Sequence, residues 1–407
     1  MGFKILYVVP FFPYPPHGGG WLRVSNIIAQ LSKNNEIHLC TLGLEKKDFS
    51  YESQMMAEQY CNSVHVIQHR SSKIKAVAKQ FITGKPYEIT LFQNTAMKKK
   101  VEELVKTLKP DIIYCSRLSG SQFIPMPNDI FAVIDQHDLS SHLWATIYQG
   151  SSRLWIRLYA AINLMMVKLY EKKVYDSFDV NIAVSEAEEK MTKSIVRNTK
   201  VWVMPNGVDL DFFKPMPDVK IQKFSLVLTG KMDQKRNIDA AVFISKKVFP
   251  KICEKFKTAQ FYIVGRNPTK EVKALRAIKG VYVTGIVPDV RPFIAAGNVV
   301  VAPFTTGSGV KHKMTIAMAM CKPIIATTNA CQGLALRHQE HLIVAETTAG
   351  FVKAIIELFL NPKLCDKLSK NAYNLAIKQY DWKKIVQRFE KKLSREVAEK
   401  KCLQNEN

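Results

Sequence analysis

Short apolar runs alternate with longer amphipathic stretches along the chain. In the first half, β-branched apolar runs occupy 4–9, 36–42, 111–116 and 131–137, and helical patterns such as 21–33 and 95–108 separate them. A second series follows "MPNGVD", at 225–230, 260–265, 281–285, 298–303 and 323–328. Such alternation predicts βαβ units, and therefore parallel sheets covered by helices on both faces.

Two series of this kind predict two doubly wound α/β domains, as does a length of 407 residues. The hinge is expected near 200–208, where Pro205 and Gly207 interrupt regular structure. Ligands of doubly wound sheets bind beyond the carboxyl ends of the strands. We therefore expect two Rossmann-like domains that face a central cleft.

The segment 152–175 reads as a long helix that is apolar around much of its circumference. Arginines at 153 and 157 and lysines at 168, 172 and 173 lie near its ends. The favoured interpretation is a packed core helix. The alternative is a helix that touches an anionic bilayer surface.

The charge balance favours anionic partners. The chain has 59 Lys and Arg against 35 Asp and Glu, a formal net charge of +24. Such a charge suits nucleic acid, phosphorylated small molecules or an anionic membrane surface. No basic tail or zinc-finger spacing is present, so we expect no nucleic-acid partner.

The cysteines and apolar segments favour a cytoplasmic protein. Eight cysteines are scattered without a CxxC pair, as expected in a reducing compartment. The N-terminal run is broken by prolines and reads as a first strand rather than a signal peptide. No stretch reaches the roughly 18 apolar residues of a membrane span.

Glycine-rich or basic loops follow several predicted strands. "PHGGGWLRV" (16–24) opens a helix, and its backbone N–H groups could hold a phosphate or a polar sugar group, although such a turn is often only a tight connection. "TGKMDQKRN" (229–237) places Lys231, Lys235 and Arg236 where cations could neutralise a diphosphate, unless it is a solvated basic loop. "VGR" adds Arg266 at another strand end.

The strongest loop is "PFTTGSGVKHK" (303–313), where lysines enter the first turn of a helix and oppose its dipole. A bound anion would remove that conflict. In the helix that follows, Met314, Ala317, Met318 and Cys321 have the spacing of a core face. Ile316 points about 150° away from that face, towards the cleft or solvent.

Polar residues also end a strand in the first half. "IDQHDLSSHLW" (134–144) contains Asp135, His137, Asp138 and His142, which could handle protons or bind a sugar, although a lone histidine is more often structural. Asp209 and Asp211 follow "PNGV" and read as turn or capping residues, so we predict no metal.

In combination, "PNGVDLDFFKP", "LTGKMDQKRNIDAA", "FYIVGRNP", residues 281–327 and "YDWKKIVQRFE" resemble glycosyltransferase family 4 of the GT-B fold, closest to its exopolysaccharide branch. The resemblance implies a retaining transferase that uses a nucleotide-sugar and needs no metal or other cofactor. It implies an acceptor-binding domain over 1–204 and a nucleotide-sugar-binding domain over 205–379. A final helix at about 380–395 would return to the first domain, followed by a basic and polar tail, 396–407.

The resemblance also implies roles for individual residues. The catalytic residues would be His137, Asp138, Lys231 and Arg236. The acceptor-binding residues would be Arg23 and His142. The donor-binding residues would be Gly18, Gly19, Gly20, Gly230, Arg266, Thr306, Gly307, Ser308, Gly309, Val310 and Ile316.

The chain departs from the family pattern "KxLEAMAxGKP", because it reads "KMTIAMAMCKP". Ile316 occupies the position of a glutamate that binds the ribose, Ser308 stands where an earlier glutamate is usual, and Cys321 replaces a glycine. Loss of a charged ribose contact would remove roughly 1.5–3 kcal/mol of binding, or about one to two powers of ten in affinity.

The sequence thus predicts a metal-independent hexosyltransferase that acts on a lipid-linked or polysaccharide acceptor in cell-surface glycan synthesis, including exopolysaccharide or lipopolysaccharide. It would work in the cytoplasm, on the inner face of the cell membrane. Two alternatives stay open: a non-catalytic GT-B subunit of a glycan assembly complex, and a nucleotide-sugar epimerase of the same fold.

Overall fold

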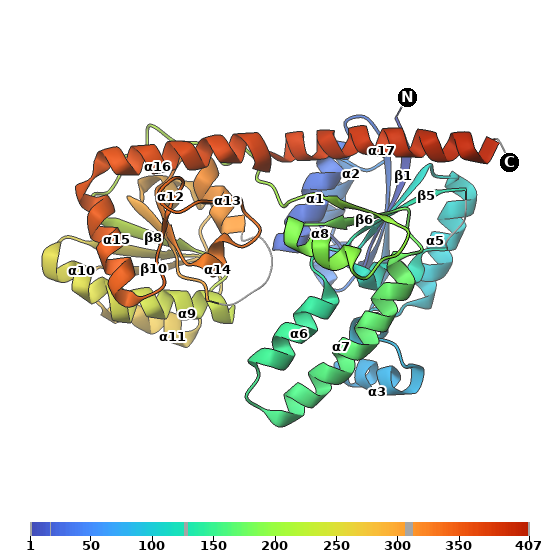
Figure 1. The fold of residues 1–407 in the computed structure, drawn as a ribbon, viewed down its shortest axis with the longest axis horizontal. Coiled ribbons are helices and arrows are strands. Elements are labelled where there is room, and N and C mark those ends of the chain that lie inside the picture. The colour runs from blue at the N-terminus through green and yellow to red at the C-terminus, as the bar shows by residue number, and fades with distance from the viewer. Residues whose placement is uncertain (1, 17, 126–128, 306–311, 406–407) are drawn as a thin grey trace. The chain divides into compact units, whose positions relative to one another are not determined.

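A computed structural model describes residues 2–16, 18–125, 129–305 and 312–405. The chain divides into two compact α/β units (Figure 1). Unit 1 comprises Met1–Pro205 and Ile385–Asn407, and unit 2 comprises Asn206–Lys384. The prediction of a two-domain α/β protein with parallel sheets is confirmed.

Unit 1 is built on a seven-stranded parallel sheet of order β3-β2-β1-β4-β5-β6-β7. Its strands are β1 (Lys4–Val9), β2 (Glu36–Gly43), β3 (Ser63–Gln68), β4 (Ile112–Ser116), β5 (Phe131–Asp135), β6 (Val180–Ala183) and β7 (Lys200–Val203). From Ile5 to Val9 the central strand β1 is fully buried, because helices cover both faces of the sheet. The strand order reverses between β1 and β4, which is where such sheets bind ligands.

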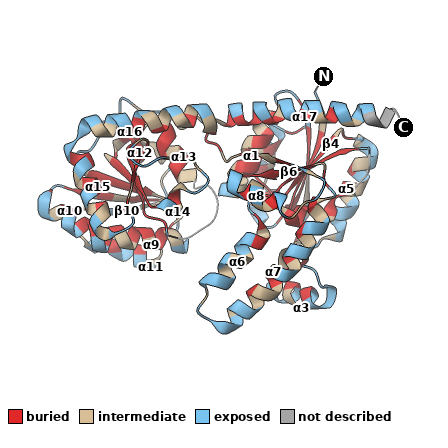
Figure 2. Ribbon diagram, in the orientation of Figure 1, coloured by how far each residue is buried: buried red, intermediate tan, exposed pale blue. Residues whose placement is uncertain are grey.

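The helices of unit 1 are α1 (Gly19–Leu31), α2 (Tyr51–Glu58), α3 (Lys73–Thr83), α4 (Tyr87–Leu91), α5 (Thr95–Leu108), α6 (Ser140–Gly150), α7 (Leu154–Tyr175) and α8 (Glu186–Lys193). Helices α6 and α7 form an antiparallel hairpin that extends away from the sheet, and α3 lies beside α7 (Figure 1). Most of this hairpin is exposed or half-exposed (Figure 2). The favoured interpretation of 152–175 as a packed core helix is therefore wrong for one face of α7, which leaves Leu154, Leu158 and Leu169 exposed.

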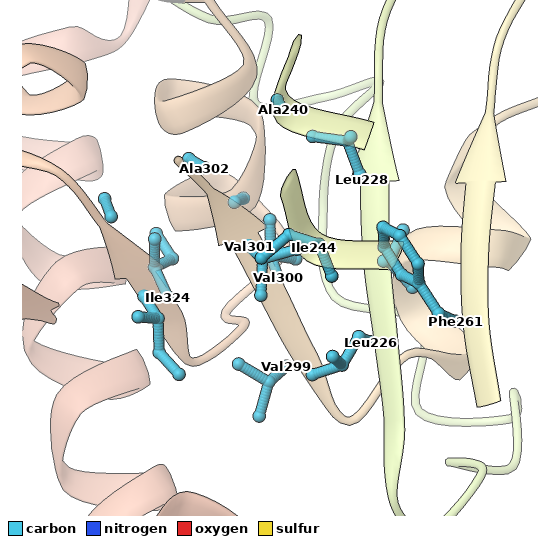
Figure 3. Close-up of a cluster of buried hydrophobic side chains, with 14 of the residues drawn as sticks. Leu226, Leu228, Ala240, Ile244, Phe261, Val299, Val300, Val301, Ala302 and Ile324 are labelled. Atoms are coloured by element: carbon cyan, nitrogen blue, oxygen red, sulfur yellow. The ribbon is translucent and has the colours of Figure 1, made fainter. Parts of the chain in front are cut away.

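Unit 2 contains a six-stranded parallel sheet of order β10-β9-β8-β11-β12-β13. Its strands are β8 (Ser225–Thr229), β9 (Gln260–Val264), β10 (Val281–Gly285), β11 (Val299–Ala302), β12 (Ile324–Ala326) and β13 (Ile343–Val344). Its helices are α9 (Lys235–Phe243), α10 (Phe249–Lys255), α11 (Lys270–Ala274), α12 (Arg291–Ala296), α13 (His312–Ala319), α14 (Thr328–Cys331), α15 (Thr348–Leu360) and α16 (Pro362–Leu375). Side chains of β8, β11 and β12 meet Ile244 and Phe261 in a buried hydrophobic core (Figure 3).

Helix α17 (Trp382–Asn405) begins in unit 2 and continues into unit 1. Within unit 1 it buries Phe389 and Leu393, and Lys400 pairs with Asp179 at 2.8 Å. The helix runs on through most of the residues expected to form a separate tail.

Four strands were not predicted: β3, β6, β7 and β13. Three of them have four residues or fewer, and β3 contains a histidine and is only partly buried. Runs this short or this polar carry little periodicity, so their pairing depends on neighbouring strands.

Candidate functional site

In unit 1, the register of two neighbouring strands brings polar residues together. Strands β4 and β5 pair with Ser116 opposite Asp135, so the residues after each strand lie side by side. Ser116 Oγ lies 2.8 Å from His137 Nε2, and Asp135 Oδ2 lies 3.8 Å from the same nitrogen. The structure therefore gathers a hydroxyl, an imidazole and a carboxylate beside the point where the strand order reverses.

Asp135 is held by a buried ion pair with Arg23 of α1. Arg23 Nε donates to both carboxylate oxygens, at 3.0 and 2.8 Å, and Tyr114 Oη donates at 3.1 Å. Burial raises the pKa of Asp135, but the charge and hydrogen bonds of Arg23, together with His137 and Tyr114, outweigh burial and hold the pKa below its usual value. Arg23 also donates to the Met204 carbonyl at 3.0 Å. The structure thus places Arg23, expected to bind the acceptor, inside the unit as the partner of Asp135.

His137 is buried and electrically neutral near pH 7. Burial lowers its pKa to about 3, although the carboxylate of Asp135 opposes this shift. Its Nδ1 is buried and has no hydrogen-bond partner among the described residues. A Cβ atom on Gly20 would lie 3.4 Å from Nδ1, so glycine leaves this nitrogen uncrowded. A neutral imidazole with one uncommitted nitrogen is suited to hydrogen bond with a ligand hydroxyl.

Arg117 was missed in the sequence, although it directly follows β4. Its guanidinium lies 5.4 Å from the ring centre of Phe11 and 3.8 Å from the Cβ position of Gly20. Arg117 and His137 both have left-handed backbones, with φ of 66° and 63°. Such conformations are strained in non-glycine residues and are found disproportionately at functional sites.

The other predicted residues of unit 1 lie around this cluster or apart from it. Gly18 precedes α1 and its carbonyl accepts from Leu22 N at 2.8 Å, and Gly19 is the first residue of that helix. Asp138 is exposed. His142 lies on α6 and lines a separate hollow of about 530 Å³.

In unit 2, two glycines allow the ends of β8 and β9 to touch. Gly230 and Gly265 have φ of 156° and 153°, which favours glycine. A Cβ atom on Gly265 would lie 1.7 Å from the Gly230 carbonyl oxygen. No other residue fits at 265 without moving the backbone.

Lys313 is the central cation at these strand ends, although the sequence did not single it out as a site residue. Its Nζ donates to Asn237 Oδ1 at 2.6 Å and lies 4.2 Å from the ring centre of Phe304. A Cβ atom on Gly230 would come within 2.8 Å of the same Nζ, so glycine permits the approach. Asn237 Nδ2 in turn donates to the Lys231 carbonyl at 2.8 Å. This network links the end of β8 and the starts of α9 and α13.

Further cations surround this network. Lys231 is partly exposed and lies 3.3 Å from Asp233. Arg236 lies in the first turn of α9, where it donates to Gln234 Oε1 at 3.3 Å. Arg266 lies next to the same loop, because its carbonyl accepts from Met232 N at 2.8 Å. Cations at a helix N-terminus lie beside the positive end of the helix dipole, which is unfavourable. A bound anion would offset the charge of the side chains and that of the helix end.

Helix α13 is more buried than its sequence periodicity predicts. Met314, Ala317 and Met318 face the core as expected, but Thr315 is also fully buried. Ile316 is half-buried and packs against the core of unit 2, so core packing accounts for part of this isoleucine. Cys321 lies beyond the helix end, with a left-handed φ of 52°, and is not part of its core face.

Five predicted donor-binding residues lie outside the described residues: Thr306, Gly307, Ser308, Gly309 and Val310. In the described ranges, no group of three or more His, Cys, Asp and Glu side chains is placed to hold a metal ion. Asp209 accepts hydrogen bonds from the backbone of Asp211 and Phe212, as a turn residue does.

Comparison with known families matches both units. Residues 17–212 match the model of Glycosyltransferase Family 4, and residues 223–361 match that of Glycosyl transferases group 1. The chain belongs to glycosyltransferase family 4. An uncharacterised 44.6 kDa protein in the cps region of Klebsiella pneumoniae is 21% identical over 402 residues, which cover 94% of this chain and 97% of that protein.

Solved structures show the same fold. Sucrose-phosphate synthase from Thermosynechococcus elongatus superposes with a TM-score of 0.69 at 16% identity, over 97% of this chain and 99% of that one. Anabaena Alr3699/HepE in complex with UDP gives a TM-score of 0.67 at 17% identity, over 96% and 100%. The GT-B fold is thereby confirmed.

Proposed function

We propose that this glycosyltransferase is a retaining, metal-independent hexosyltransferase that moves a sugar from a nucleotide-sugar to a lipid-linked or polysaccharide acceptor. Unit 2 would bind the nucleotide diphosphate and unit 1 the acceptor. The cation network around Lys313 carries the proposal, because it concentrates positive charge at the ligand-binding end of the unit 2 sheet. The solved Anabaena relative binds UDP.

The reaction breaks the bond between the anomeric carbon and a phosphate oxygen and forms a bond to an acceptor oxygen. Negative charge grows on the departing diphosphate. Lys231, Arg236 and Lys313 would stabilise this charge, and a fixed cation in a partly buried site stabilises it more than water does. The acceptor hydroxyl loses its proton as the new bond forms, and the departing phosphate can take it.

The unit 1 cluster would orient a sugar hydroxyl through His137. Since the imidazole is neutral and its Nδ1 is uncommitted among the described contacts, it can exchange a hydrogen bond with a hydroxyl without carrying charge. Ser116 and Asp135 hold the ring from the opposite nitrogen. Asp138, which is exposed three residues after the end of β5, would bind a further hydroxyl.

We assign the enzyme to the cytoplasm, at the inner face of the cell membrane, in the synthesis of a cell-surface glycan. The relative from a cps region supports the pathway, and the net charge of +24 supports an anionic surface as a partner. No helix of the described residues is long and apolar enough to cross a membrane.

The test is a thermal-shift screen of UDP, GDP and ADP, followed by transfer assays with the matching nucleotide-sugars. We expect one diphosphate to raise the melting temperature. Lys231→Ala with Arg236→Ala should lower turnover by about a hundredfold or more, since each removes a charge contact. The matched control is Lys246→Ala with Lys247→Ala, on exposed lysines elsewhere in unit 2. The absence of both diphosphate binding and transfer would overturn the proposal.

The non-catalytic alternative rests on Ile316, which supplies no carboxylate for a ribose. Diphosphate binding without transfer from any donor, with every tested acceptor, would favour that alternative. Anomeric configuration of the product, read by NMR, decides whether transfer retains or inverts. Conversion of the donor without added acceptor would instead identify an epimerase.

A further inference from the structure

The hairpin of α6 and α7, together with α3, has an apolar surface that no described residue covers. Half of the large exposed hydrophobic side chains in the described chain lie on these three helices, ten of twenty. On α7, Leu154, Leu158, Met165 and Leu169 follow one another at intervals of four, seven and four residues, so they share a face. Leu154 is 79% exposed and the neighbouring Trp155 is 65% exposed.

The opposite face of α7 is anchored to the rest of unit 1. Ala160, Asn163 and Val167 are buried there. Asn163 Oδ1 accepts from Gln80 of α3 at 2.8 Å, and Tyr159 donates to the same glutamine at 3.0 Å. Helix α3 is thereby fixed against α7. The apolar face therefore belongs to an ordered element of the fold.

Helix α3, which lies beside α7 (Figure 1), has exposed apolar residues of its own. Ile74, Phe81 and Ile82 are exposed, at seven- and eight-residue spacing, so they lie on one side of the helix. Ile82 is 82% exposed. We refer to the exposed apolar residues of α3 and α7 as the hairpin surface.

The hairpin surface is bordered almost entirely by positive charge. Residues 70–86 and 139–175 contain ten Lys and Arg and one acidic residue, Glu171. Glu171 is buried, and burial raises its pKa to about 7. Arg153 and Arg157 lie at one end of α7, and Lys168 and Lys172 lie towards the other.

A hollow of about 530 Å³ opens beside these lysines. Lys168, Lys172 and Arg197 line it together with His142 and Ser141, and apolar residues such as Met191 form its walls. Among the described residues that line this hollow there is no carboxylate. Its size and charge suit the phosphate of a lipid headgroup.

We infer that the hairpin surface binds an anionic lipid bilayer, with Leu154, Trp155 and Leu158 entering the interface and the basic hollow holding a phosphate headgroup. Apolar side chains with lysines and arginines around them bind such surfaces through both burial and charge. A second copy would bring the same excess of positive charge to the contact, and charge repulsion would oppose it. The inference rests on the proposed function in one respect: a lipid-linked acceptor would be held in the same bilayer.

Vesicle co-sedimentation of the full chain tests the inference. Vesicles of phosphatidylcholine alone are compared with equal mixtures of phosphatidylcholine and phosphatidylglycerol. We expect binding only to the anionic mixture, and weaker binding at high salt. Lys168→Glu with Lys172→Glu should weaken binding by about a hundredfold, since each reversal changes the charge by two. Leu154→Ser with Leu158→Ser should weaken it by about tenfold or more.

Matched controls lie in unit 2. Lys246→Glu with Lys247→Glu changes the charge equally, and Ile221→Ser with Ile286→Ser removes apolar residues that are also exposed. Both should bind vesicles as the unaltered chain does. Emission of Trp155 should shift to shorter wavelength on binding, and Trp155→Phe should remove this shift.

Three outcomes would overturn the inference: no binding to anionic vesicles, equal losses in the hairpin and unit 2 variants, or a concentration-dependent dimer that the hairpin variants abolish. Nucleoside diphosphate binding is measured on the same samples. Intact diphosphate binding without vesicle binding overturns the surface and leaves the proposed function standing. Vesicle binding without diphosphate binding would support the hairpin surface and count against the proposed function.

Discussion

At the scale of single residues, His137 has three features that each lower the stability of the fold, so packing elsewhere must offset them. Its backbone is left-handed, its ring is buried, and one ring nitrogen has no hydrogen-bond partner among the described residues. A left-handed backbone alone costs roughly 1–2 kcal/mol in a residue with a side chain. Residues that lower stability in this way cluster at functional sites, where binding a ligand requires them.

Acid should destabilise unit 1 through His137. Its pKa is near 6.5 when unfolded and about 3 in the structure, so between these values only the unfolded chain binds the proton. Stability is therefore complete above pH 6.5 and falls as the pH drops, by about 2 kcal/mol at pH 5. His137→Asn, which tolerates the left-handed backbone, should reduce that slope in denaturant unfolding between pH 5 and 7. An unchanged slope would contradict the buried neutral imidazole.

A carboxylate restored at position 316 should strengthen nucleotide binding. Ile316→Glu is expected to strengthen binding of the preferred nucleoside diphosphate by about tenfold, through one charge-assisted hydrogen bond. Because Ile316 packs partly against the core, the same change should lower the melting temperature of unit 2 slightly. Ile316→Gln has the same length without the charge and should gain less affinity. If titration calorimetry shows no gain with glutamate, Ile316 does not lie beside the ribose.

At the scale of elements, the end of α13 accounts for the glycine that the family resemblance implies at the position of Cys321. The Lys322 N–H donates to the Ala317 carbonyl and the Cys321 N–H to the Met318 carbonyl, both at 3.0 Å. This pattern is a Schellman motif, and it requires a left-handed residue at 321. Cysteine adopts that conformation at a cost that glycine avoids.

Cys321→Gly should therefore stabilise unit 2 by about 1 kcal/mol, because a β-carbon is removed from a left-handed position. For a unit of this size, the melting temperature should rise by about 2–4 °C in calorimetry. Cys321→Ala keeps the β-carbon and should give no such rise. Equal effects of the two substitutions would argue against the backbone explanation.

At the scale of the whole molecule, α17 makes the two ends of the chain interdependent. Its part in unit 1 buries Ile385, Val386, Phe389, Leu393 and Val397. The ring centre of Phe389 lies 6.0 Å from that of Tyr114, which in turn donates to Asp135. The last helix thereby packs behind the unit 1 cluster.

Truncation after Lys384 should unfold unit 1 and spare unit 2. Each lost buried side chain contributes about 1.5–3 kcal/mol, and five of them reach the whole stability of an average domain. Calorimetry should show that one unfolding transition disappears while diphosphate binding by unit 2 persists. Truncation after Cys402, which retains these side chains and Lys400, should keep both transitions. Two transitions in the shorter chain would contradict this role of α17.

The sequence by itself determined the fold class, the two βα series and most of the central strands, because buried parallel strands are long apolar runs with glycine or proline at their ends. It also located the loops with candidate chemistry, since each follows such a strand. Short strands such as β6 and β13 stayed hidden, because a few residues carry no distinct period.

Only the tertiary structure decided which side chains meet. It paired Arg23 with Asp135, brought Lys313 against Gly230, and turned one apolar face of α7 outward. These contacts join residues that are far apart in the sequence or depend on which face of a helix finds a neighbour. Strand register and helix packing determine these contacts. The local periodicity of the sequence does not specify register or packing partners.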